Sequence, residues 1–230
     1  MYKMKAIILA AGEGTRMRPL TATMPKPLID LGSKKIIDYV LSSLPDEIDE
    51  VILVVDYLKE KIIEYLGNNF GNKKISYVMQ GNKKGTYGAL LSVKDLIQDE
   101  ERFMVLNSDD IHDKLELTEY LKFPRSFGVQ KMIMPNYYNV QTDSEEYIDG
   151  FSKQTEEEKV SGAMVGTGVY VLDSKIFDHP GVVVYGGELG LPQTILEQKK
   201  EYPVRAVVTE KWIPINTIED LERIRKTIRK

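Results

Sequence analysis

The sequence predicts an α/β fold built on a mostly parallel sheet. Short apolar runs alternate with amphipathic helical patterns through the first half of the chain. Several of these runs lack polar alternation, which is typical of strands that are covered on both faces. Regular alternation of strand and helix favours βαβ units, in which helices cover both faces of a parallel sheet.

The individual elements follow from the spacing of apolar residues. Strand-like runs occupy 6–10, 51–55, 75–79, 103–107, 131–135, 168–173 and 204–208. Helical periodicity is found over 34–44, 59–67, 86–97 and 218–228. The polar stretch 136–163 has no long apolar run, so we expect a hairpin or long loops inserted in the sheet. No repeat, linker or low-complexity tract marks a boundary, which indicates one domain over 1–230.

Composition excludes several classes of protein. The chain has no cysteine, so it can form neither a disulfide nor a thiolate metal site. The formal net charge of −4 disfavours nonspecific binding to nucleic acid or to anionic membranes. No apolar run approaches the ~20 residues of a membrane span, and no signal-peptide pattern precedes the first strand, so we expect a cytoplasmic protein. The sequence leaves a homo-oligomer open.

The loop after the first strand is the strongest candidate for a phosphate site. Residues 10–28 read AAGEGTRMRPLTATMPKPL, with two glycines followed by Arg16 and Lys26. Open α/β sheets bind ligands beyond the carboxyl ends of their strands. A dinucleotide fingerprint, G-x-G-x-x-G, fails here because Met17 occupies the third glycine position, and no P-loop string occurs in the chain.

The wider string LAAGEGTRMRPLTATMPKPLI (9–29) resembles the signature of the sugar-phosphate nucleotidylyltransferases, LAGGxGTRLxPLTxxxPKPL. Ala11 stands where many members have glycine, and Met17 where they have leucine. The resemblance implies a GT-A-like fold, that is, a Rossmann-like three-layer α/β/α arrangement around a mixed, mostly parallel sheet. It also implies a nucleotide-binding half over about 1–115 and an acceptor-binding half over about 116–230.

The resemblance implies roles for the residues of this first segment. Arg16 and Lys26 would be catalytic, as the cations that hold the reacting phosphates. The residues that would bind the nucleotide are Leu9, Ala11, Gly12, Glu13, Gly14 and Thr15.

A second segment, MQGNKKGTYGALLSV (79–93), is similar to the Q-x(4)-G-T-x-G-A segment of the same family. The resemblance implies that Gln80 and Gly85 contact the nucleobase and that Thr86 also belongs to the nucleotide-binding residues. Thr86 is also a good N-cap residue, so a purely structural role at a helix start stays open.

The string FMVLNSDDIHD (103–113) looks like the family's VLNGD, whose aspartate binds Mg²⁺. The resemblance therefore implies Asp109 as a Mg²⁺ ligand, with Ser108 in the usual glycine position. A carboxylate just past a buried strand suits a hard cation, although Ser-Asp-Asp is also common in turns and caps. His112 and His179 have no ligand-like spacing, and we expect both at the surface.

Two later segments resemble the acceptor-binding part of the family. In IDGFSKQ (148–154), Lys153 aligns with a sugar-contacting lysine, while Ser152 replaces the glutamate that normally binds sugar hydroxyls. In MVGTGVYVLD (164–173), the resemblance places Gly166 and Thr167 near the sugar. Because the glutamate is missing, an acceptor other than glucose 1-phosphate stays open.

The last segment, KWIPINTIEDL (211–221), is similar to the family's W-x-D-x-G-T-x-E-D-L. Pro214 replaces the second metal-binding aspartate and has no side-chain oxygen. Asn216 lies two residues on and could supply an amide oxygen to Mg²⁺. It could equally form a capping box with Glu219 at the start of the final helix. We expect Trp212 to be a packing residue.

The family resemblance implies an enzyme that transfers a nucleotidyl group from a nucleoside triphosphate to a sugar 1-phosphate and releases pyrophosphate. Its partners would be these two substrates, and Mg²⁺ its cofactor. No general base is required, since a phosphate monoester with a second pKa of ~6 is already ionised at neutral pH.

Two alternatives stay open. One is a cytidylyltransferase that acts on a non-hexose phosphate monoester, and the other is a catalytically silent, nucleotide-binding regulatory relative, which Ser152 and Pro214 suggest. The nucleobase is also open. A chain of 230 residues is expected to be too short for the β-helix acyltransferase domain of some bifunctional relatives.

Overall fold

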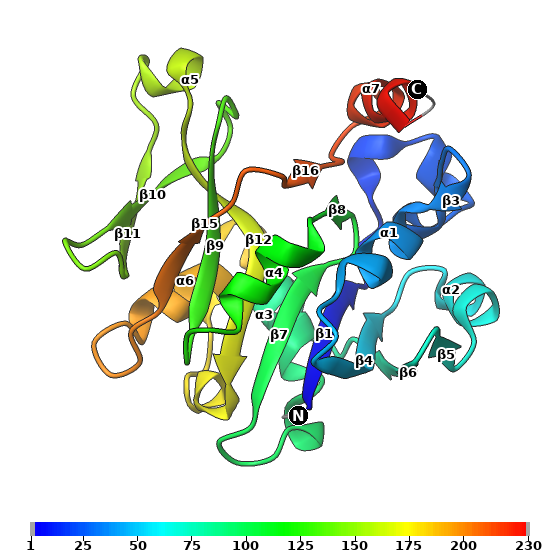
Figure 1. Cartoon of the computed structure of the whole chain (residues 1–230), viewed down its shortest axis with the longest axis horizontal. Coiled ribbons are helices and arrows are strands. Elements are labelled where there is room, and N and C mark those ends of the chain that lie inside the picture. The colour runs from blue at the N-terminus through cyan, green and yellow to red at the C-terminus, as the bar shows by residue number, and fades with distance from the viewer. Residues whose placement is uncertain (1–2, 229–230) are drawn as a thin grey trace.

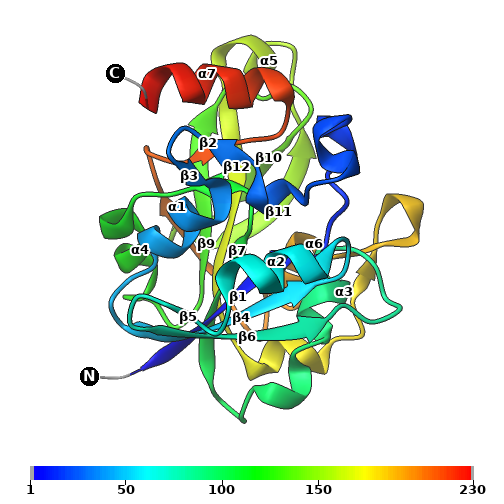
Figure 2. The ribbon, with the colours of Figure 1, turned by 90° about the vertical axis from the view of Figure 1, so that its right-hand side faces the viewer.

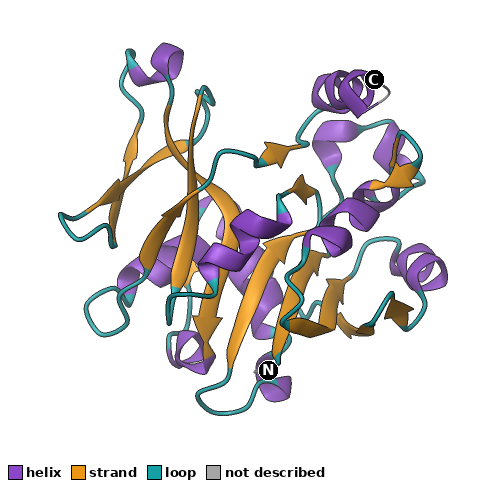
Figure 3. Ribbon diagram, in the orientation of Figure 1, coloured by secondary structure: helices purple, strands orange, loops and turns teal. Residues whose placement is uncertain are grey.

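An eight-stranded sheet forms the centre of the computed structural model, which describes residues 3–228. Its strand order is β15-β9-β12-β7-β1-β4-β6-β5 (Figures 1 and 3). The strands are β1 (Met4–Ala10), β4 (Ile48–Val55), β5 (Asn69–Phe70), β6 (Lys73–Met79), β7 (Arg102–Asn107), β9 (Ser126–Met132), β12 (Ala163–Asp173) and β15 (Arg205–Val208). The sheet thus takes strands from both halves of the chain.

Strand direction determines which residues share an edge of this sheet. β1 runs parallel to β4 and β7, β4 runs parallel to β6, and β9 runs parallel to β15. β12 is antiparallel to both β7 and β9, and the short β5 is antiparallel to β6. The carboxyl ends of β1, β4, β6, β7 and β9 therefore meet at one edge, and β12 begins there. The predicted mixed, mostly parallel sheet is confirmed.

Helices cover both faces of the sheet because neighbouring strand residues point to opposite sides. In β1, Ala6 and Ile8 belong to one apolar cluster and Ile7 to the other. The first cluster includes α1 (Ile36–Ser43), α2 (Lys59–Leu66) and α4 (Lys114–Tyr120). The second includes α3 (Thr86–Leu91) and α6 (Leu191–Glu197). The predicted three-layer α/β/α arrangement is therefore present.

Smaller elements surround this sandwich. β10 (Tyr138–Thr142) and β11 (Ile148–Lys153) form an antiparallel hairpin that stands off the sheet together with α5 (Glu158–Ser161) (Figure 1). This is the hairpin predicted in the polar stretch 136–163. The remaining short pairs are β2 (Asp30–Leu31) with β3 (Lys34–Lys35), β8 (Asp110–Ile111) with β16 (Ile213–Pro214), and β13 (Val182–Val183) with β14 (Leu189–Gly190).

The last helix, α7 (Ile218–Ile228), packs on the segment that follows β1. Leu221 and Ile224 of α7 join an apolar cluster with Met17, Ile29, Leu31, Ile36 and Ile215. Figure 2 shows α7 lying over β2 and β3, at the same end of the molecule. The last helix of the chain therefore packs beside the loop that resembles the nucleotide-binding signature.

Several predicted boundaries were wrong. The strand expected at 131–135 is β9, at Ser126–Met132, where Phe127 and Val129 alternate with buried Ser126 and Gln130 and so hide the apolar pattern. The strand expected at 168–173 begins earlier, at Ala163.

Helical predictions also needed correction. The helix expected over 86–97 ends at Leu91 and is followed by a 3-10 turn at Lys94–Leu96, while α4 and α6 were not predicted. Within residues 3–228, no helix combines the length and apolar character of a membrane span.

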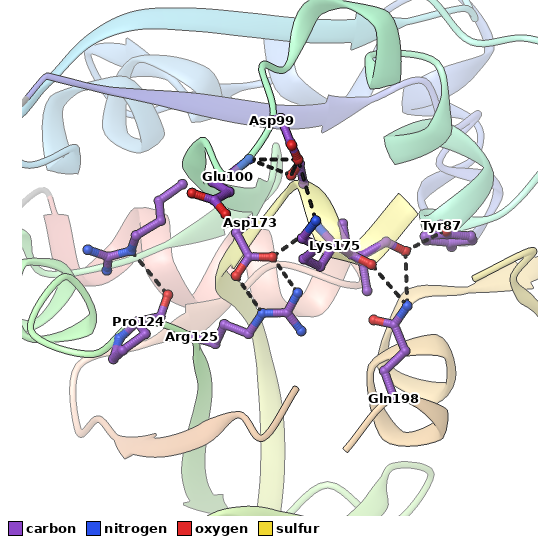
Figure 4. A network of polar contacts seen from close by, with 11 residues as sticks. Tyr87, Asp99, Glu100, Pro124, Arg125, Asp173, Lys175 and Gln198 are labelled. Carbon is purple, nitrogen blue, oxygen red and sulfur yellow. Dashed lines mark hydrogen bonds and ion pairs between the residues drawn. The ribbon is translucent and has the colours of Figure 1, made fainter. Parts of the chain in front are cut away.

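A buried ion pair joins β9 and β12 at the end of the sheet opposite to the shared carboxyl edge (Figure 4). Arg125 Nε donates to Asp173 Oδ2 at 2.8 Å, and a second guanidinium N–H donates to Oδ1. The Arg125 side chain is 5% exposed and stacks on the ring of Tyr202 at 4.5 Å from its centroid. Partial burial opposes ionisation of Asp173, but Arg125 and the Lys175 N–H hold its pKa below the ordinary value.

We predict that Asp173→Asn lowers the free energy of unfolding by about 3 kcal/mol at pH 7, because it leaves the Arg125 guanidinium buried without its counter-ion. The pKa of Asp173 is depressed, so its contribution is present above the unfolded value of 3.8 and is lost as pH falls through the lower folded value. Urea unfolding of both proteins at pH 7 and pH 3 measures this difference. Asp99→Asn is the control, since Asp99 pairs with Lys175 from an 83% exposed position; an equal loss in both variants would contradict the prediction.

Candidate active site

A cavity of about 1130 Å³ opens at the edge where the parallel strands end. Residues that follow β1, β4, β6 and β7 line one side of it, and residues of β12, the β10–β11 hairpin and the segment after β14 line the other. This is the edge at which open α/β sheets bind ligands. Both halves of the chain therefore contribute to one cavity.

The loop after β1 is held in a tight turn around Gly14. Gly14 has φ 62°, a left-handed conformation that favours glycine. Its carbonyl accepts from the Met17 N–H at 2.9 Å and from the Thr21 hydroxyl at 2.9 Å. A Cβ at this position would lie 3.1 Å from Thr21 Cγ2 and 3.2 Å from Lys26 Cβ. The turn buries Met17 completely and leaves the neighbouring Arg16 exposed on the cavity wall.

The two cations predicted to be catalytic lie in different surroundings. Lys26 is only 8% exposed and forms an ion pair with Asp109. Arg16 lies on the exposed loop, and no ion pair within residues 3–228 involves it. Arg16 is thus available to a ligand as it stands, whereas Lys26 and the predicted metal ligand Asp109 now neutralise each other.

Asp110 is the buried carboxylate of the site. Burial, followed by the negative charge of Asp109, raises the pKa of Asp110 to about 7, although the Asn107 amide donates to it at 3.0 Å and Lys26 lies nearby. It forms the short β8–β16 pairing opposite Pro214. The residue that replaces the second aspartate of the signature therefore lies next to this second carboxylate.

Carboxylates outnumber cations on the cavity wall. The acidic residues are Glu13, Asp56, Asp109, Asp110 and Glu188, and the basic ones are Arg16, Lys26 and Lys84. Asp56 and Lys84 pair with each other at 2.8 Å. The side chains of the wall therefore do not by themselves offset the charge of a triphosphate.

The residues present fit a magnesium ion that is shared with phosphates. Mg²⁺ usually takes one or two protein carboxylates and completes its shell with waters and phosphate oxygens. Asp109 and Asp110 supply hard oxygen donors beside each other. Among residues 3–228 there is no group of three histidine, cysteine or acidic side chains that could enclose a metal alone. The donor set therefore suits a metal bound together with its nucleotide.

Asn216 also lines the cavity, and its local contacts correct one prediction. The capping box of α7 is formed by Thr217 and Asp220, with Asp220 N–H donating to Thr217 Oγ1 at 3.2 Å and Thr217 N–H donating to Asp220 Oδ2 at 3.1 Å. The capping box therefore lies one residue later in the sequence than the possible box between Asn216 and Glu219. Asn216 Nδ2 instead donates to the Tyr137 hydroxyl at 3.1 Å, and no hydrogen bond within residues 3–228 uses its amide oxygen.

The residues predicted to contact the nucleobase lie on the loop after β6. Gln80 Nε2 donates to the carbonyl of Lys83 at 3.0 Å, so its amide oxygen is left to accept from a ligand. Thr86 does not cap its own helix, since Gly85 is the N-cap of α3. The Thr86 hydroxyl accepts from the Leu191 N–H at 2.9 Å, at the start of α6.

Gly85 is constrained by a segment from the second half of the chain. Its φ is +90°, and a Cβ there would lie 2.5 Å from the carbonyl oxygen and 2.7 Å from the nitrogen of Leu189. The Leu189 N–H also donates to the Lys84 carbonyl at 2.9 Å. The loop after β6 and strand β14 are therefore fixed to each other, and residue Glu188 on the cavity wall lies next to this contact.

Gly166 and Thr167 were predicted to lie near the sugar. Both residues belong to β12 and line the cavity. Lys153 does not: it is exposed and lies outside the residues of the cavity wall. Tyr138, Val140 and Phe151 of the same hairpin line the cavity instead. The hairpin thus presents an apolar surface where the family resemblance implied a lysine.

The expectations for the two histidines and the tryptophan had different outcomes. His112 was predicted at the surface but is buried, and burial lowers its pKa to about 3. His179 is half-buried, and its Nδ1 accepts from the Gly181 N–H at 3.0 Å. Trp212 packs against Ala163 and Val165, as expected, and also lines the cavity.

Sequence reasoning missed several residues of the wall. Asp56 and Tyr57 directly follow β4, so the rule that ligands bind at the carboxyl ends of strands would have identified them. Tyr57 donates to the carbonyls of Thr21 and Ala22 and thereby supports the loop after β1. Glu188 and Gln193 come from the segment around β14 and α6. No strand was predicted there, so no signal in the sequence indicated that this segment reaches the cavity.

A cavity at the carboxyl edge of a mostly parallel sheet is typical of ligand-binding α/β proteins. The chain matches the family described as Nucleotidyl transferase over residues 5–184. It is 35% identical over 207 residues to the bifunctional protein GlmU of Methanocaldococcus jannaschii, covering 89% of this chain and 49% of that protein. It is 36% identical over 188 residues to mannose-1-phosphate guanylyltransferase 1 of Arabidopsis thaliana, covering 76% of this chain and 51% of that protein.

The chain therefore belongs to the nucleotidyl transferase family, and the family predicted from the sequence is confirmed. It spans about half the length of the curated relatives it matches. Its fold is that of a UDP-glucose pyrophosphorylase solved in complex with UDP-glucose, with a TM-score of 0.82 at 20% identity, covering 99% of this chain and 98% of that one. That likeness concerns the fold.

We predict that Gly85→Ala destabilises the protein by about 2–5 kcal/mol, as the sum of a left-handed conformation and an overpacked contact with Leu189. Gly67→Ala is the matched control, because Gly67 (φ 59°, ψ −144°) resembles Gly85 (φ 90°, ψ 174°) in having an extended ψ at positive φ, but has no atom within 4 Å of a new Cβ. It should cost only the conformational part, about 1–2 kcal/mol. Urea unfolding measures both, and equal losses would show that the contact with Leu189 is unimportant.

Proposed function

We propose that this protein transfers a nucleotidyl group from a nucleoside triphosphate to a phosphate monoester of the sugar 1-phosphate class and releases pyrophosphate. One observation carries the proposal: Arg16, Lys26 and the Asp109–Asp110 pair face the same cavity as the acceptor residues of β12 and the hairpin. Family membership supports the reaction type, because the named relatives include a sugar-1-phosphate guanylyltransferase. The two substrates would meet in one cavity.

The reaction joins two polyanions, so the protein must reduce their repulsion and hold them in line. A phosphate oxygen of the acceptor would attack the α-phosphorus as pyrophosphate departs. We assign the leaving pyrophosphate to Arg16, whose side chain is free of ion pairs within the described residues and exposed on the Gly14 turn. Loop N–H groups between Ala11 and Thr15 would cradle the triphosphate.

We assign the reacting phosphate to Lys26. It is buried at the base of the cavity between the Gly14 turn and Asp109, so its ammonium group is held in place before the substrates arrive. Its charge would offset the charge that builds up on the α-phosphate during transfer. The acceptor phosphate is already ionised at neutral pH, so the chain needs no residue to remove a proton.

We assign Mg²⁺ to Asp109, with Asp110 and the amide oxygen of Asn216 beside it. When bound, the ion would neutralise triphosphate charge and orient the phosphates. Binding of the ion at Asp109 would also release Lys26 from its present ion pair. Tyr137 would fix the orientation of the Asn216 amide through their hydrogen bond.

We predict that Arg16→Ala and Lys26→Ala each lower turnover by about 100-fold or more, as expected for loss of a fixed charge in the transition state. Arg18→Ala is the matched control: Arg18 lies on the same loop but is 56% exposed, pairs with Glu13 and does not line the cavity. The assay measures pyrophosphate released with Mg²⁺, each nucleoside triphosphate and a panel of phosphate monoesters. Wild-type rates in either cavity variant would refute these assignments.

We predict that Asp109→Asn and Asn216→Ala each raise the Mg²⁺ concentration needed for half-maximal activity by roughly tenfold or more, since even supporting partners of a metal site have effects of that size. Mn²⁺ binding in the presence of nucleotide, followed by electron paramagnetic resonance, provides a readout independent of turnover. Asp46→Asn is the control, because Asp46 is 78% exposed, pairs with Lys114 and lies outside the cavity. An unchanged metal requirement in Asn216→Ala would remove Asn216 from the site.

A further inference from the structure

The loop between β6 and α3 carries the residues that we expect at the nucleobase. It comprises residues 80–85, and the stretch from Gly81 to Lys84 is exposed. Within the first half of the chain, the Gly81 N–H donates to Ser92 Oγ at 3.1 Å. An exposed loop with little packing of its own opens easily. Its position therefore depends on the contacts at its end.

The end of this loop is held by the second half of the chain. The Lys84 carbonyl accepts from the Leu189 N–H at 2.9 Å. The Thr86 hydroxyl accepts from the Leu191 N–H, also at 2.9 Å. The next residue along the chain contacts the η5 turn (Ser174–Asp178), the 3-10 turn that follows β12. Successive residues at the start of α3 thus contact one continuous stretch of the second half.

Tyr87 makes the contact with the η5 turn, and it is fully buried. Its hydroxyl donates to the carbonyls of Ile176 and His179, at 2.8 Å and 2.6 Å. Burial, followed by the charge of Asp178, raises the pKa of Tyr87 to about 12, so the hydroxyl stays protonated and donates at neutral pH. A Cβ at Gly181 would lie 2.6 Å from Tyr87 Cδ1, so the main chain after the turn packs directly against the ring.

The η5 turn is itself fixed in the core. Gln198 Nε2 donates at 3.4 Å to the Ile176 carbonyl, the same carbonyl that accepts from Tyr87 (Figure 4). Phe177 of the turn stacks on Phe103 of β7, with ring centroids 5.9 Å apart. Tyr87 therefore ties the start of α3 to a support that is held from both α6 and the central sheet.

The loop after β6 lies apart from the loop that carries the two cations. Strand β4 separates β1 from β6 in the sheet, so the two loops begin about 10 Å apart. Arg16 and Lys26 belong to the loop after β1, and Gln80 and Gly85 to the loop after β6. A shift of the loop after β6 would change the contacts at one end of a nucleotide and leave those at the other end in place.

We propose that Tyr87 is a positioning residue for recognition of the nucleobase, because its hydroxyl holds the loop after β6 against the η5 turn. The inference rests on the proposed function, in which Gln80 and Gly85 meet the base. Recognition by a few polar contacts requires that their positions be set before the ligand arrives. Tyr87 is not among the residues described on the cavity wall, so it acts on the choice of nucleotide through the loop.

Tyr87→Phe tests this inference, since it removes the hydroxyl and keeps the ring. Isothermal titration calorimetry measures binding of UTP, dTTP, CTP, GTP and ATP with Mg²⁺ and without acceptor, and inorganic tripolyphosphate serves as a probe that lacks a base. We expect the variant to bind the preferred triphosphate about fivefold more weakly, as the loss of one hydrogen bond predicts. Tripolyphosphate should bind both proteins equally, so the preference among triphosphates should shrink by the same factor.

Initial rates of pyrophosphate release give a second readout. The KM for the triphosphate should rise about fivefold, while kcat and the KM for the acceptor stay within about twofold of wild type, because the lost interaction is made equally in the ground state and the transition state. A general loss of structure would lower kcat as well.

Tyr65→Phe is the matched control. The Tyr65 hydroxyl also donates one hydrogen bond, to Asp38 Oδ2 at 2.7 Å, but it lies on α2, on the other face of the sheet and outside the cavity wall as described. Its affinities and rates should match wild type. Melting temperatures show whether each variant is folded. Should Tyr87→Phe fail to fold, Gln198→Met takes its place, because Gln198 supports the same carbonyl from α6.

The outcomes separate this inference from the proposed function. Unchanged binding of every triphosphate by a folded Tyr87→Phe protein overturns the inference, even if wild type releases pyrophosphate. An equal loss for tripolyphosphate also overturns it, since the effect would then not concern the base. A reduced preference among triphosphates in a protein that releases no pyrophosphate supports the inference and overturns the proposed reaction. A wild-type protein that binds no triphosphate overturns both.

Discussion

The ion pair between Lys26 and Asp109 links the two segments on which the site depends. Lys26 follows the loop after β1, and Asp109 follows β7, so the pair joins neighbouring strands at their carboxyl ends. Asp110 is buried beside it, and burial together with Asp109 raises the pKa of Asp110. The ammonium group of Lys26 offsets part of this negative charge. A cation bound at Asp109 would leave Lys26 without this partner, as proposed above.

The antiparallel strand β12 explains how one sheet edge gathers residues from both halves of the chain. Parallel strands deliver only their carboxyl ends to the cavity, but β12 runs the other way and delivers its amino end. Gly166 and Thr167 therefore lie beside the residues that follow β7, although almost sixty residues separate them in sequence. The hairpin that connects β9 to β12 is placed above the same edge. Topology, rather than sequence proximity, brings Gly166 and Thr167 into the same cavity as the loop after β1.

The motifs that resemble the family made the fold class and the part of the cavity wall formed by the loop after β1 predictable from sequence, because short-range spacing identifies them. Asp56 and Tyr57 were also within reach, since they end a clear strand. Glu188, Tyr138 and Phe151 were not, because long-range packing decides which side of a hairpin or loop faces a cavity. Lys153 shows the converse: it aligned with a functional lysine, but its side chain is exposed outside the wall. The capping box of α7 lies one residue later than the sequence suggested. Thr217 and Asp220 form it, because this pair has the same spacing as Asn216 and Glu219 and equally suitable side chains.

The packing of α7 on the segment after β1 has a consequence for biosynthesis. Met17 anchors the glycine turn, and it is covered by Leu221 and Ile224 from the far end of the sequence. A nascent chain on the ribosome therefore holds the complete signature string long before it can bury that anchor. The loop after β1 can gain this packing only when translation has passed α7, so a polypeptide comprising residues 1–115 alone would carry the motif without it.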